Sequence, residues 1–132
     1  DQIRELRLEQ RFFFLGFRPN IPQLLKDLDV FVLSSTDEGL SIATIEAMAA
    51  SRPVVVTRSG GPQEVVRDAE TGLLVPPRDP SELASRIIQI LQDPAMAERL
   101  GRAARADVEE RFSLAKMISA YEALYLKCLG GN

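Results

Sequence analysis

Short runs of apolar residues recur along the chain, and stretches with helical periodicity separate them. Three of these runs, Val30 to Leu33, Val54 to Val56 and Leu73 to Val75, contain no polar residue. Continuous apolar character is typical of strands in a parallel sheet that is covered on both faces. The alternation therefore predicts an α/β domain in which βα repeats surround a parallel sheet.

Further elements are predicted between and before these runs. Phe12 to Leu15 is strand-like, and its phenylalanines are more typical of strand packing than of a base-stacking platform. Pro22 can open a short helix that continues to about Leu28. A helix from about Ser41 to Ala50 connects the first two apolar runs, and one helical turn is allowed from Gln63 to Arg67.

The last third of the chain is helical by pattern. Asp79 as N-cap, with Pro80 next and Glu82 three residues after the cap, predicts a helix start, and Asp93-Pro94 repeats the signal one helix later. Ser113 can cap a final helix. We expect its apolar stripe to dock on a missing domain or to drive self-association of this chain. The stripe consists of Leu114, Met117, Ile118, Tyr121, Leu124, Tyr125 and Cys128.

The loop and helix between the first two apolar runs carry the candidate chemistry. Two glutamates, Glu38 and Glu46, are separated by seven residues and bracket the point where the loop becomes a helix. That helix is apolar all round, which predicts that it is buried. A buried carboxylate is costly unless it accepts hydrogen bonds, and the vicinal hydroxyls of a ribose or sugar ring would satisfy Glu46. Sugar-nucleotide binding is therefore the first hypothesis.

A phosphate site is predicted beside these carboxylates. Ligands of open α/β sheets collect at the carboxyl ends of the strands, where this loop meets the helix N-terminus. The amides of Leu40, Ser41 and Ile42 and the helix dipole would suit an anion there. Gly39 would let the backbone approach closely or take a positive φ. Glu46 would lie about one turn deeper, roughly 5–7 Å along the helix axis.

Each of these residues also has a plainer interpretation. Glu38 by itself could be a solvated loop carboxylate, Glu46 a surface residue at a helix edge, and Gly39 an ordinary turn glycine. We interpret Gly60-Gly61 as a tight connection rather than a phosphate loop, and Arg58 as a solvated side chain. Taken jointly, the order and spacing of the loop residues favour one ligand.

Composition narrows the functional classes. A length of 132 residues suits one domain, and the net charge of −3 with scattered signs argues against a nucleic-acid surface. No apolar run is long enough to span a bilayer. The chain has no histidine, which removes imidazole catalysis and disfavours a metal site. Its one cysteine, Cys128, cannot form an internal disulfide, so we expect a reducing, cytoplasmic location.

Several motifs together resemble the retaining glycosyltransferases of the group 1 (family 4) type. The resemblance begins with the spacing of Glu38 and Glu46 and extends in order over nearly the whole chain. The further blocks that resemble this family are Phe14-Leu15-Gly16-Phe17, Glu46-Ala47-Met48-Ala49, Arg52-Pro53-Val54-Val55-Val56, Gly60-Gly61-Pro62-Gln63-Glu64-Val65-Val66, Thr71-Gly72-Leu73-Leu74-Val75-Pro76-Pro77 and Arg111-Phe112-Ser113.

The resemblance implies a GT-B architecture, in which two Rossmann-like domains face each other across a cleft. Residues 1–132 would form part of the C-terminal, donor-binding domain: a Rossmann-like, three-layer unit with C-terminal helices. Glu38 would contact hydroxyls of the transferred sugar and Glu46 those of the ribose, while the amides of residues 40–42 would meet the diphosphate or sugar. The backbone near Phe13 and Phe14 would meet the base. The substrate would be a UDP-, GDP- or ADP-sugar; no metal or other cofactor is implied, and no catalytic residue is identified.

The start of the chain at Asp1 suggests a segment of a longer protein, whose N-terminal acceptor domain and basic diphosphate-binding residues would lie upstream. Transfer requires positive charge on the leaving diphosphate and an oriented acceptor, so we expect this fragment alone to be inactive. The full-length protein would transfer a hexosyl group to a glycan or lipid, and peripheral membrane association stays open for it. Ser51 stands where the family commonly has glycine. The alternatives are a non-catalytic interaction module with the same fold and a sugar-nucleotide epimerase, which usually employs histidines.

Overall fold

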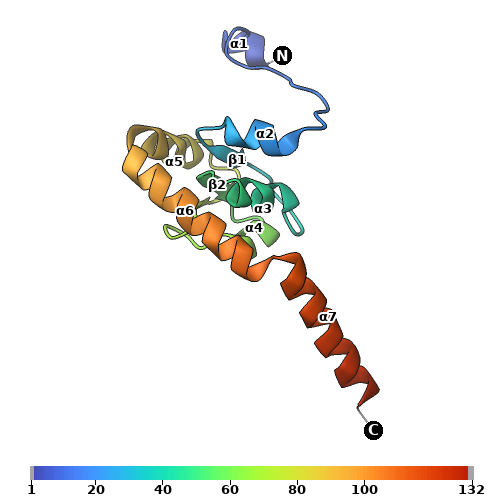
Figure 1. Cartoon of the computed structure of the whole chain (residues 1–132). Coiled ribbons are helices and arrows are strands. Elements are labelled where there is room, and N and C mark those ends of the chain that lie inside the picture. The colour runs from blue at the N-terminus through green and yellow to red at the C-terminus, as the bar shows by residue number, and fades with distance from the viewer. Residues whose placement is uncertain (1, 131–132) are drawn as a thin grey trace.

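The computed structural model, which describes residues 2–130, has a parallel three-stranded sheet at its centre (Figure 1). The sheet order is β1-β2-β3, and Val55 of the middle strand is in register with Val32 and Leu73. The three apolar runs at Val30 to Leu33, Val54 to Val56 and Leu73 to Val75 each become one strand, so the predicted α/β class is confirmed. The strands are β1 (Phe31–Leu33), β2 (Val54–Thr57) and β3 (Leu73–Val75).

Helices cover both faces of this sheet, which gives the three layers of a Rossmann-like unit. Two helices differ slightly from expectation: α2 ends at Lys26 rather than near residue 28, and α4 lies two residues earlier than the predicted turn. Among the described residues the helices are α1 (Gln2–Glu5), α2 (Ile21–Lys26), α3 (Ile42–Ala49), α4 (Gly61–Val65), α5 (Pro80–Gln92), α6 (Pro94–Arg111) and α7 (Leu114–Leu129). None of them is long and apolar enough to cross a membrane.

Alternate side chains of the strands enter two separate apolar clusters. Val54 and Val56 face one cluster, which contains Met48 of α3, whereas Val55 faces the other, which contains Ile90 of α5. All four residues of β2 are buried, because the strand is central and covered on both sides. Helix α6 packs against both clusters, since its earlier part lies with α5 and its later part with α3.

The predicted N-caps of the three long helices are confirmed. The Asp79 carboxylate accepts the Glu82 amide at 3.0 Å at the start of α5, and the Asp93 carboxylate accepts the Met96 amide at 2.9 Å at the start of α6. The Ser113 hydroxyl accepts a backbone amide of α7 at 3.4 Å. These side chains satisfy backbone donors that the first helical turn leaves without partners.

Helix α3 ends in a Schellman motif whose left-handed residue is Ser51. The Ser51 amide donates to the Met48 carbonyl at 2.9 Å and the Arg52 amide donates to the Ala47 carbonyl at 3.0 Å. Ser51 has φ of +59°, a conformation that glycine adopts more easily than serine. Helix α6 packs directly on this turn, because a Cβ placed on Gly101 would lie only 2.2 Å from the Ser51 carbonyl oxygen.

A buried carboxylate, Asp107, joins α6 to the end of α4. Its two oxygens lie 2.9 Å from the Arg67 guanidinium and 2.6 Å from that of Arg111. Arg111 also donates to the carbonyls of Glu64 and Val65, at 2.6 and 3.1 Å. The Asp107 side chain is only 5% exposed, and its charge is compensated by two guanidinium groups.

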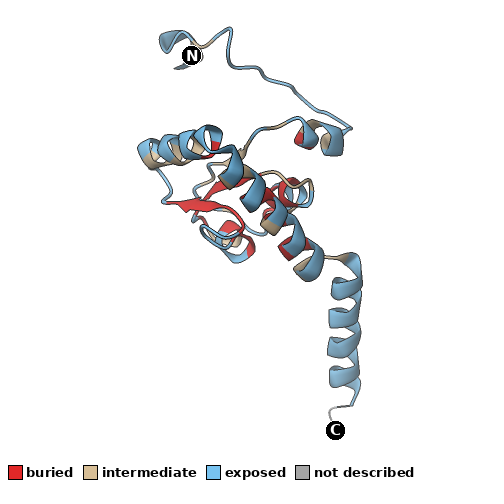
Figure 2. Ribbon diagram, turned by 60° about the vertical axis from the view of Figure 1, so that its left-hand side comes forward, coloured by how far each residue is buried: buried red, intermediate tan, exposed pale blue. Residues whose placement is uncertain are grey.

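The two ends of the described chain lie outside this packed unit (Figure 2). The structure has no strand at Phe12 to Leu15: residues 12–17 are exposed coil, with Phe14 84% and Phe17 92% exposed, so the strand prediction is wrong. A strand requires a hydrogen-bonded neighbour, and the sheet of the described residues offers none to this segment. Helix α7 extends away from the sheet, and none of its residues is buried.

Candidate functional site

The loops that follow β1 and β2 cross each other at the carboxyl edge of the sheet. The Glu38 amide donates to the Ser59 carbonyl at 2.8 Å, and the Gly61 amide donates back to the Glu38 carbonyl at 2.9 Å. These two bonds form an isolated parallel bridge between Glu38 and Gly60. The backbone of Glu38 is therefore fixed at the sheet edge where ligands of open α/β folds bind.

This crossing explains Gly60 and Gly61 and corrects the role expected of Gly39. Gly60 has φ of +101°, and a Cβ on Gly61 would lie 1.4 Å from the Gly39 carbonyl oxygen. The interpretation of the glycine pair as a tight connection is confirmed. Gly39 has no positive φ, and a Cβ placed there would meet no atom within 4 Å. The open space beside Gly39 leaves room for a ligand, but the fold itself does not require glycine at this position.

The Glu38 side chain is half-buried and held from within its own loop. The hydroxyl of Ser35 donates to Glu38 Oε2 at 3.2 Å. The Thr57 hydroxyl, at the end of β2, donates to the Ser35 carbonyl at 2.5 Å. Glu38 is therefore more than a solvated loop carboxylate, because both its backbone and its carboxyl group have defined partners.

The N-terminus of α3 provides a partly different set of amides from the one that the sequence predicts. Ser41 is the N-cap: it is buried, and its hydroxyl accepts the Thr44 amide at 3.4 Å. The Ile42 amide donates to the Leu40 carbonyl at 3.1 Å, so the expectation of a free Ile42 amide is wrong. In the part of the chain that the structure describes, the amides of Leu40, Ser41 and Ala43 have no acceptor; Leu40 and Ala43 are exposed residues, whereas Ser41 is buried. Ala43 was not predicted, although it is the second helical residue, where free donors are usual.

Glu46 is exposed, so the prediction that it is buried is wrong. Helix α3 buries only the side that carries Thr44, Ala47 and Met48. Its other side is exposed, and Ile42 there is 65% exposed. An all-apolar helix is buried only if something covers each face, and the described residues cover one face of α3. Glu46 therefore needs no hydrogen-bonded partner in this structure, and the argument from its burial does not hold.

Glu46 is nevertheless next to a cavity. It lines a cavity of about 370 Å³ between α2, α3 and α6, together with Lys26 and Arg105. Glu46 and Ile42 are four residues apart, so they lie on the same side of α3 about 6 Å apart along its axis. The structure thus brings Glu38, Gly39, Leu40, Ser41 and Ile42 together at one edge, with Glu46 one turn further along the helix.

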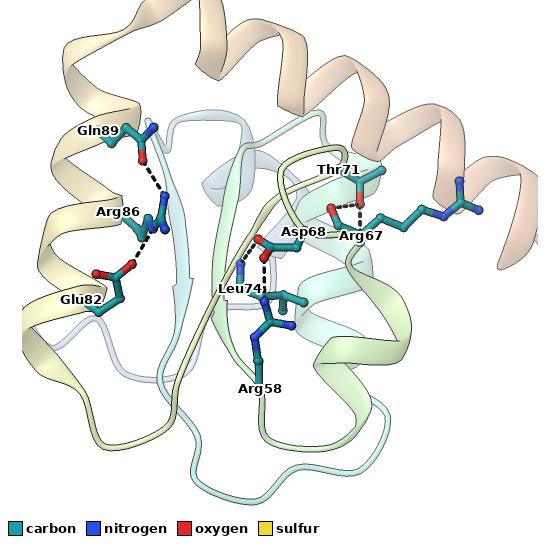
Figure 3. A network of polar contacts seen from close by, with 8 residues as sticks. All are labelled: Arg58, Arg67, Asp68, Thr71, Leu74, Glu82, Arg86 and Gln89. Carbon is teal, nitrogen blue, oxygen red and sulfur yellow. Dashed lines mark hydrogen bonds and ion pairs between the residues drawn. The ribbon is translucent and has the colours of Figure 1, made fainter.

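Arg58 follows β2, but its side chain forms an ion pair with Asp68. Its guanidinium lies 2.6 Å from Asp68 Oδ2, while Asp68 Oδ1 accepts the Leu74 amide at 2.9 Å (Figure 3). This pair connects the residue after β2 to the middle of β3 through Asp68, so Arg58 is neither a free phosphate ligand nor simply solvated. Among residues 2–130 there is no group of three or more His, Cys, Asp or Glu side chains placed to hold a metal ion.

The family of this chain follows from its similarity to known proteins. A family model for glycosyl transferases group 1 matches residues 1–107. The chain belongs to the group 1 glycosyl transferase family. It is 35% identical over 127 residues to N-acetyl-alpha-D-glucosaminyl L-malate synthase of Bacillus anthracis, covering 96% of this chain and 33% of the synthase. This group 1 chain thus spans about a third of the length of the curated relatives that it matches.

Solved structures of similar proteins have the same fold. Anabaena HepE in complex with UDP-glucose superposes with a TM-score of 0.89 at 34% identity, over 96% of this chain and 35% of HepE. The C-terminal domain of a group 1 protein, LpcC of Francisella tularensis, superposes with a TM-score of 0.78 at 25% identity, over 86% of this chain and 60% of that domain chain. The Rossmann-like unit is therefore one found in GT-B glycosyltransferases.

Proposed function

We propose that residues 1–132 are the donor-binding part of a glycosyltransferase and that they bind a nucleoside diphosphate sugar. In this proposal the Glu38 carboxylate accepts hydrogen bonds from hydroxyls of the transferred sugar. The amides of Leu40 and Ala43, with the α3 dipole, bind phosphate oxygens. Glu46, on the open side of α3, accepts hydrogen bonds from the ribose.

The observation that carries this proposal is the loop crossing at Glu38. It fixes the backbone of Glu38 at the carboxyl edge of the sheet, shortly before the unpaired amides of the exposed residues Leu40 and Ala43. A carboxylate binds hydroxyls and a helix N-terminus binds phosphate, so the pair suits a ligand with both groups. The complex of HepE with UDP-glucose, in a protein of the same fold and 34% identity, supports this ligand class.

The whole-protein activity that we propose is transfer of a hexosyl group, with retention of configuration, from a UDP-, GDP- or ADP-sugar to a glycan or lipid. It uses no metal, and its location is cytoplasmic. The acceptor-binding site and the basic residues that bind the diphosphate belong, in this proposal, to an N-terminal domain of the same longer chain. Because those groups are required for transfer, residues 1–132 alone bind donor without turnover. Multiple turnovers by this chain with any plausible donor would contradict that part of the proposal.

Calorimetric titration with nucleoside diphosphates and their sugars tests the binding proposal. We expect the wild-type chain to bind at least one UDP-, GDP- or ADP-sugar, and Glu38→Ala and Glu46→Ala to weaken that binding. Glu122→Ala, on exposed α7, is the matched control and leaves binding unchanged. An absence of binding by the wild-type chain with every donor would favour the alternative of a non-catalytic interaction module.

The exposed apolar stripe of α7 supports a second partner, another copy of this chain. Met117, Tyr121 and Leu124 are each about half exposed, and self-association of this chain would cover them. Light scattering over a range of concentrations checks this expectation. A clean monomer whose α7 amides are protected from hydrogen exchange would contradict it.

A further inference from the structure

We propose that Ser35 is a positioning residue that orients the Glu38 carboxylate toward the sugar of the donor. This inference deepens the proposed function and rests on it. The motif spacing in the sequence draws attention to the two glutamates, whereas Ser35 is an ordinary loop serine by its pattern. Its role emerges from two contacts, one of its side chain and one of its backbone.

The side-chain contact selects one arrangement of the Glu38 carboxyl group. The Ser35 hydroxyl donates to Oε2 at 3.2 Å, within a half-buried part of the loop. A glutamate side chain has several rotatable bonds, and fixing it when a ligand binds costs conformational entropy. With one oxygen already held, the remaining acceptor sites of the carboxylate stay available to sugar hydroxyls.

The second contact, to the backbone of Ser35, fixes the position of this residue. The buried Thr57 hydroxyl donates to the Ser35 carbonyl at 2.5 Å. The Ser59 carbonyl, two residues later, accepts the Glu38 amide at 2.8 Å. Ser35 and Glu38 are therefore both anchored to the end of β2, and their relative position is set by a strand whose residues are all buried. A carboxylate that is pre-organised in this way loses less conformational entropy when the sugar binds.

The neighbouring serine provides a matched control. Ser34 precedes Ser35 in the same loop but is exposed, and in the described part of the chain its hydroxyl has no hydrogen-bond partner. Ser34→Ala and Ser35→Ala remove the same atom from adjacent positions. Only the second removes the contact with Glu38, so a difference between the two variants reports on that contact.

The experiment measures the dissociation constants of UDP and UDP-glucose for the same purified chains by calorimetry. The dissociation constant of UDP divided by that of UDP-glucose isolates the contribution of the sugar to binding. We expect Ser35→Ala to lower this ratio about three- to tenfold, the effect of one hydrogen bond, while the constant for UDP stays unchanged. Ser35→Thr keeps a hydroxyl and restores the ratio, Glu38→Ala abolishes the sugar contribution, and Ser34→Ala has no effect.

The outcomes separate the inference from the function on which it rests. If Glu38→Ala removes the sugar contribution and Ser35→Ala does not, the positioning role is wrong and the donor site stands. Equal weakening of UDP and UDP-glucose by Ser35→Ala would indicate a merely structural residue and also overturn the inference. A wild-type chain that binds neither probe contradicts the donor site for uridine nucleotides and the inference together.

Discussion

Helices α6 and α7 follow each other in the chain but differ in what covers them. Both begin at a confirmed N-cap and have similar lengths, 18 and 16 residues. Helix α6 buries Leu100, Ala104 and Val108 against the sheet and α3, whereas α7 buries no residue. An apolar pattern therefore specifies that a helix has a face to cover, but not which surface covers it.

The apolar runs of the sequence show the same difference between covered and uncovered segments. Val54 to Val56 is buried because strands pair with it on both sides and helices cover both faces. Phe12 to Leu15 is equally apolar, yet it is exposed coil in the absence of a neighbouring strand. The molecule thus has a covered unit, residues 21–113, and two uncovered ends, and substitutions should have large effects only in the covered unit.

The largest expected effect comes from the loop crossing in the covered unit. Gly61→Ala places a Cβ against the Gly39 carbonyl, at a separation of 1.4 Å, so the two loops must move apart. We expect the free energy of unfolding to fall by about 3 kcal/mol and donor binding to be lost. Chemical denaturation and calorimetry measure the two effects.

The matched control is the glycine on the other side of the same contact. Gly39→Ala adds a Cβ that meets no atom within 4 Å, so stability should be unchanged. Binding of a nucleotide sugar should still weaken if the ligand passes close to this backbone. Equal destabilisation by both substitutions would contradict the difference in packing between Gly39 and Gly61 at the loop crossing.

The next effect concerns the buried carboxylate that joins α6 to α4. Asp107→Asn leaves Arg67 and Arg111 without their counter-charge, and we expect a loss of about 2 kcal/mol in unfolding free energy. This is below the cost for fully buried pairs, because the Arg67 side chain is 55% exposed.

Glu109→Gln tests the specificity of that result on the same helix. It removes an exposed pair with Arg105, whose side chains are 60% and 56% exposed, and should change stability by less than about 0.5 kcal/mol. Denaturant titration of the two variants, at low and high salt, gives the comparison. A similar loss of unfolding free energy for both variants would mean that the burial of Asp107 adds nothing to the stabilising effect of its ion pairs.

A smaller effect, of opposite sign, is expected at the end of α3. Ser51 is the left-handed residue of the Schellman motif, so Ser51→Gly relieves backbone strain and should raise the unfolding free energy by roughly 0.5–1 kcal/mol. Ala50→Gly is the adjacent control: its φ is −78°, so the substitution should lower stability instead. Thermal unfolding distinguishes the two signs, and a gain at both positions would argue against strain at Ser51.

The sequence was sufficient where local chemistry decides the structure. The apolar runs became β1, β2 and β3, and the caps Asp79, Asp93 and Ser113 start the predicted helices. These features depend on residues close together in the chain. The position of Glu38 at the carboxyl edge of the sheet also follows from a strand–loop–helix order.

The sequence was insufficient where distant segments meet or fail to meet. The burial of Glu46 depended on a cover for the second face of α3 that the described residues do not supply. The contacts of Asp107 with Arg67, and of Ser35 with Thr57, join segments whose approach no local pattern indicates. The glycine requirement was predicted at Gly39, but close backbone approach occurs at Gly61.

The smallest expected effect tests the uncovered end. Leu124→Ala in α7 removes a side chain that is 53% exposed, and at low protein concentration the unfolding free energy of the packed unit should not change. Leu100→Ala makes the same substitution at a fully buried position of α6 and should cost about 3 kcal/mol. If α7 drives self-association, the effect of Leu124→Ala should appear only as concentration rises, because association stabilises the folded state by mass action. A loss at all concentrations would mean that α7 packs on the unit in solution, and the contrast between α6 and α7 would then be wrong.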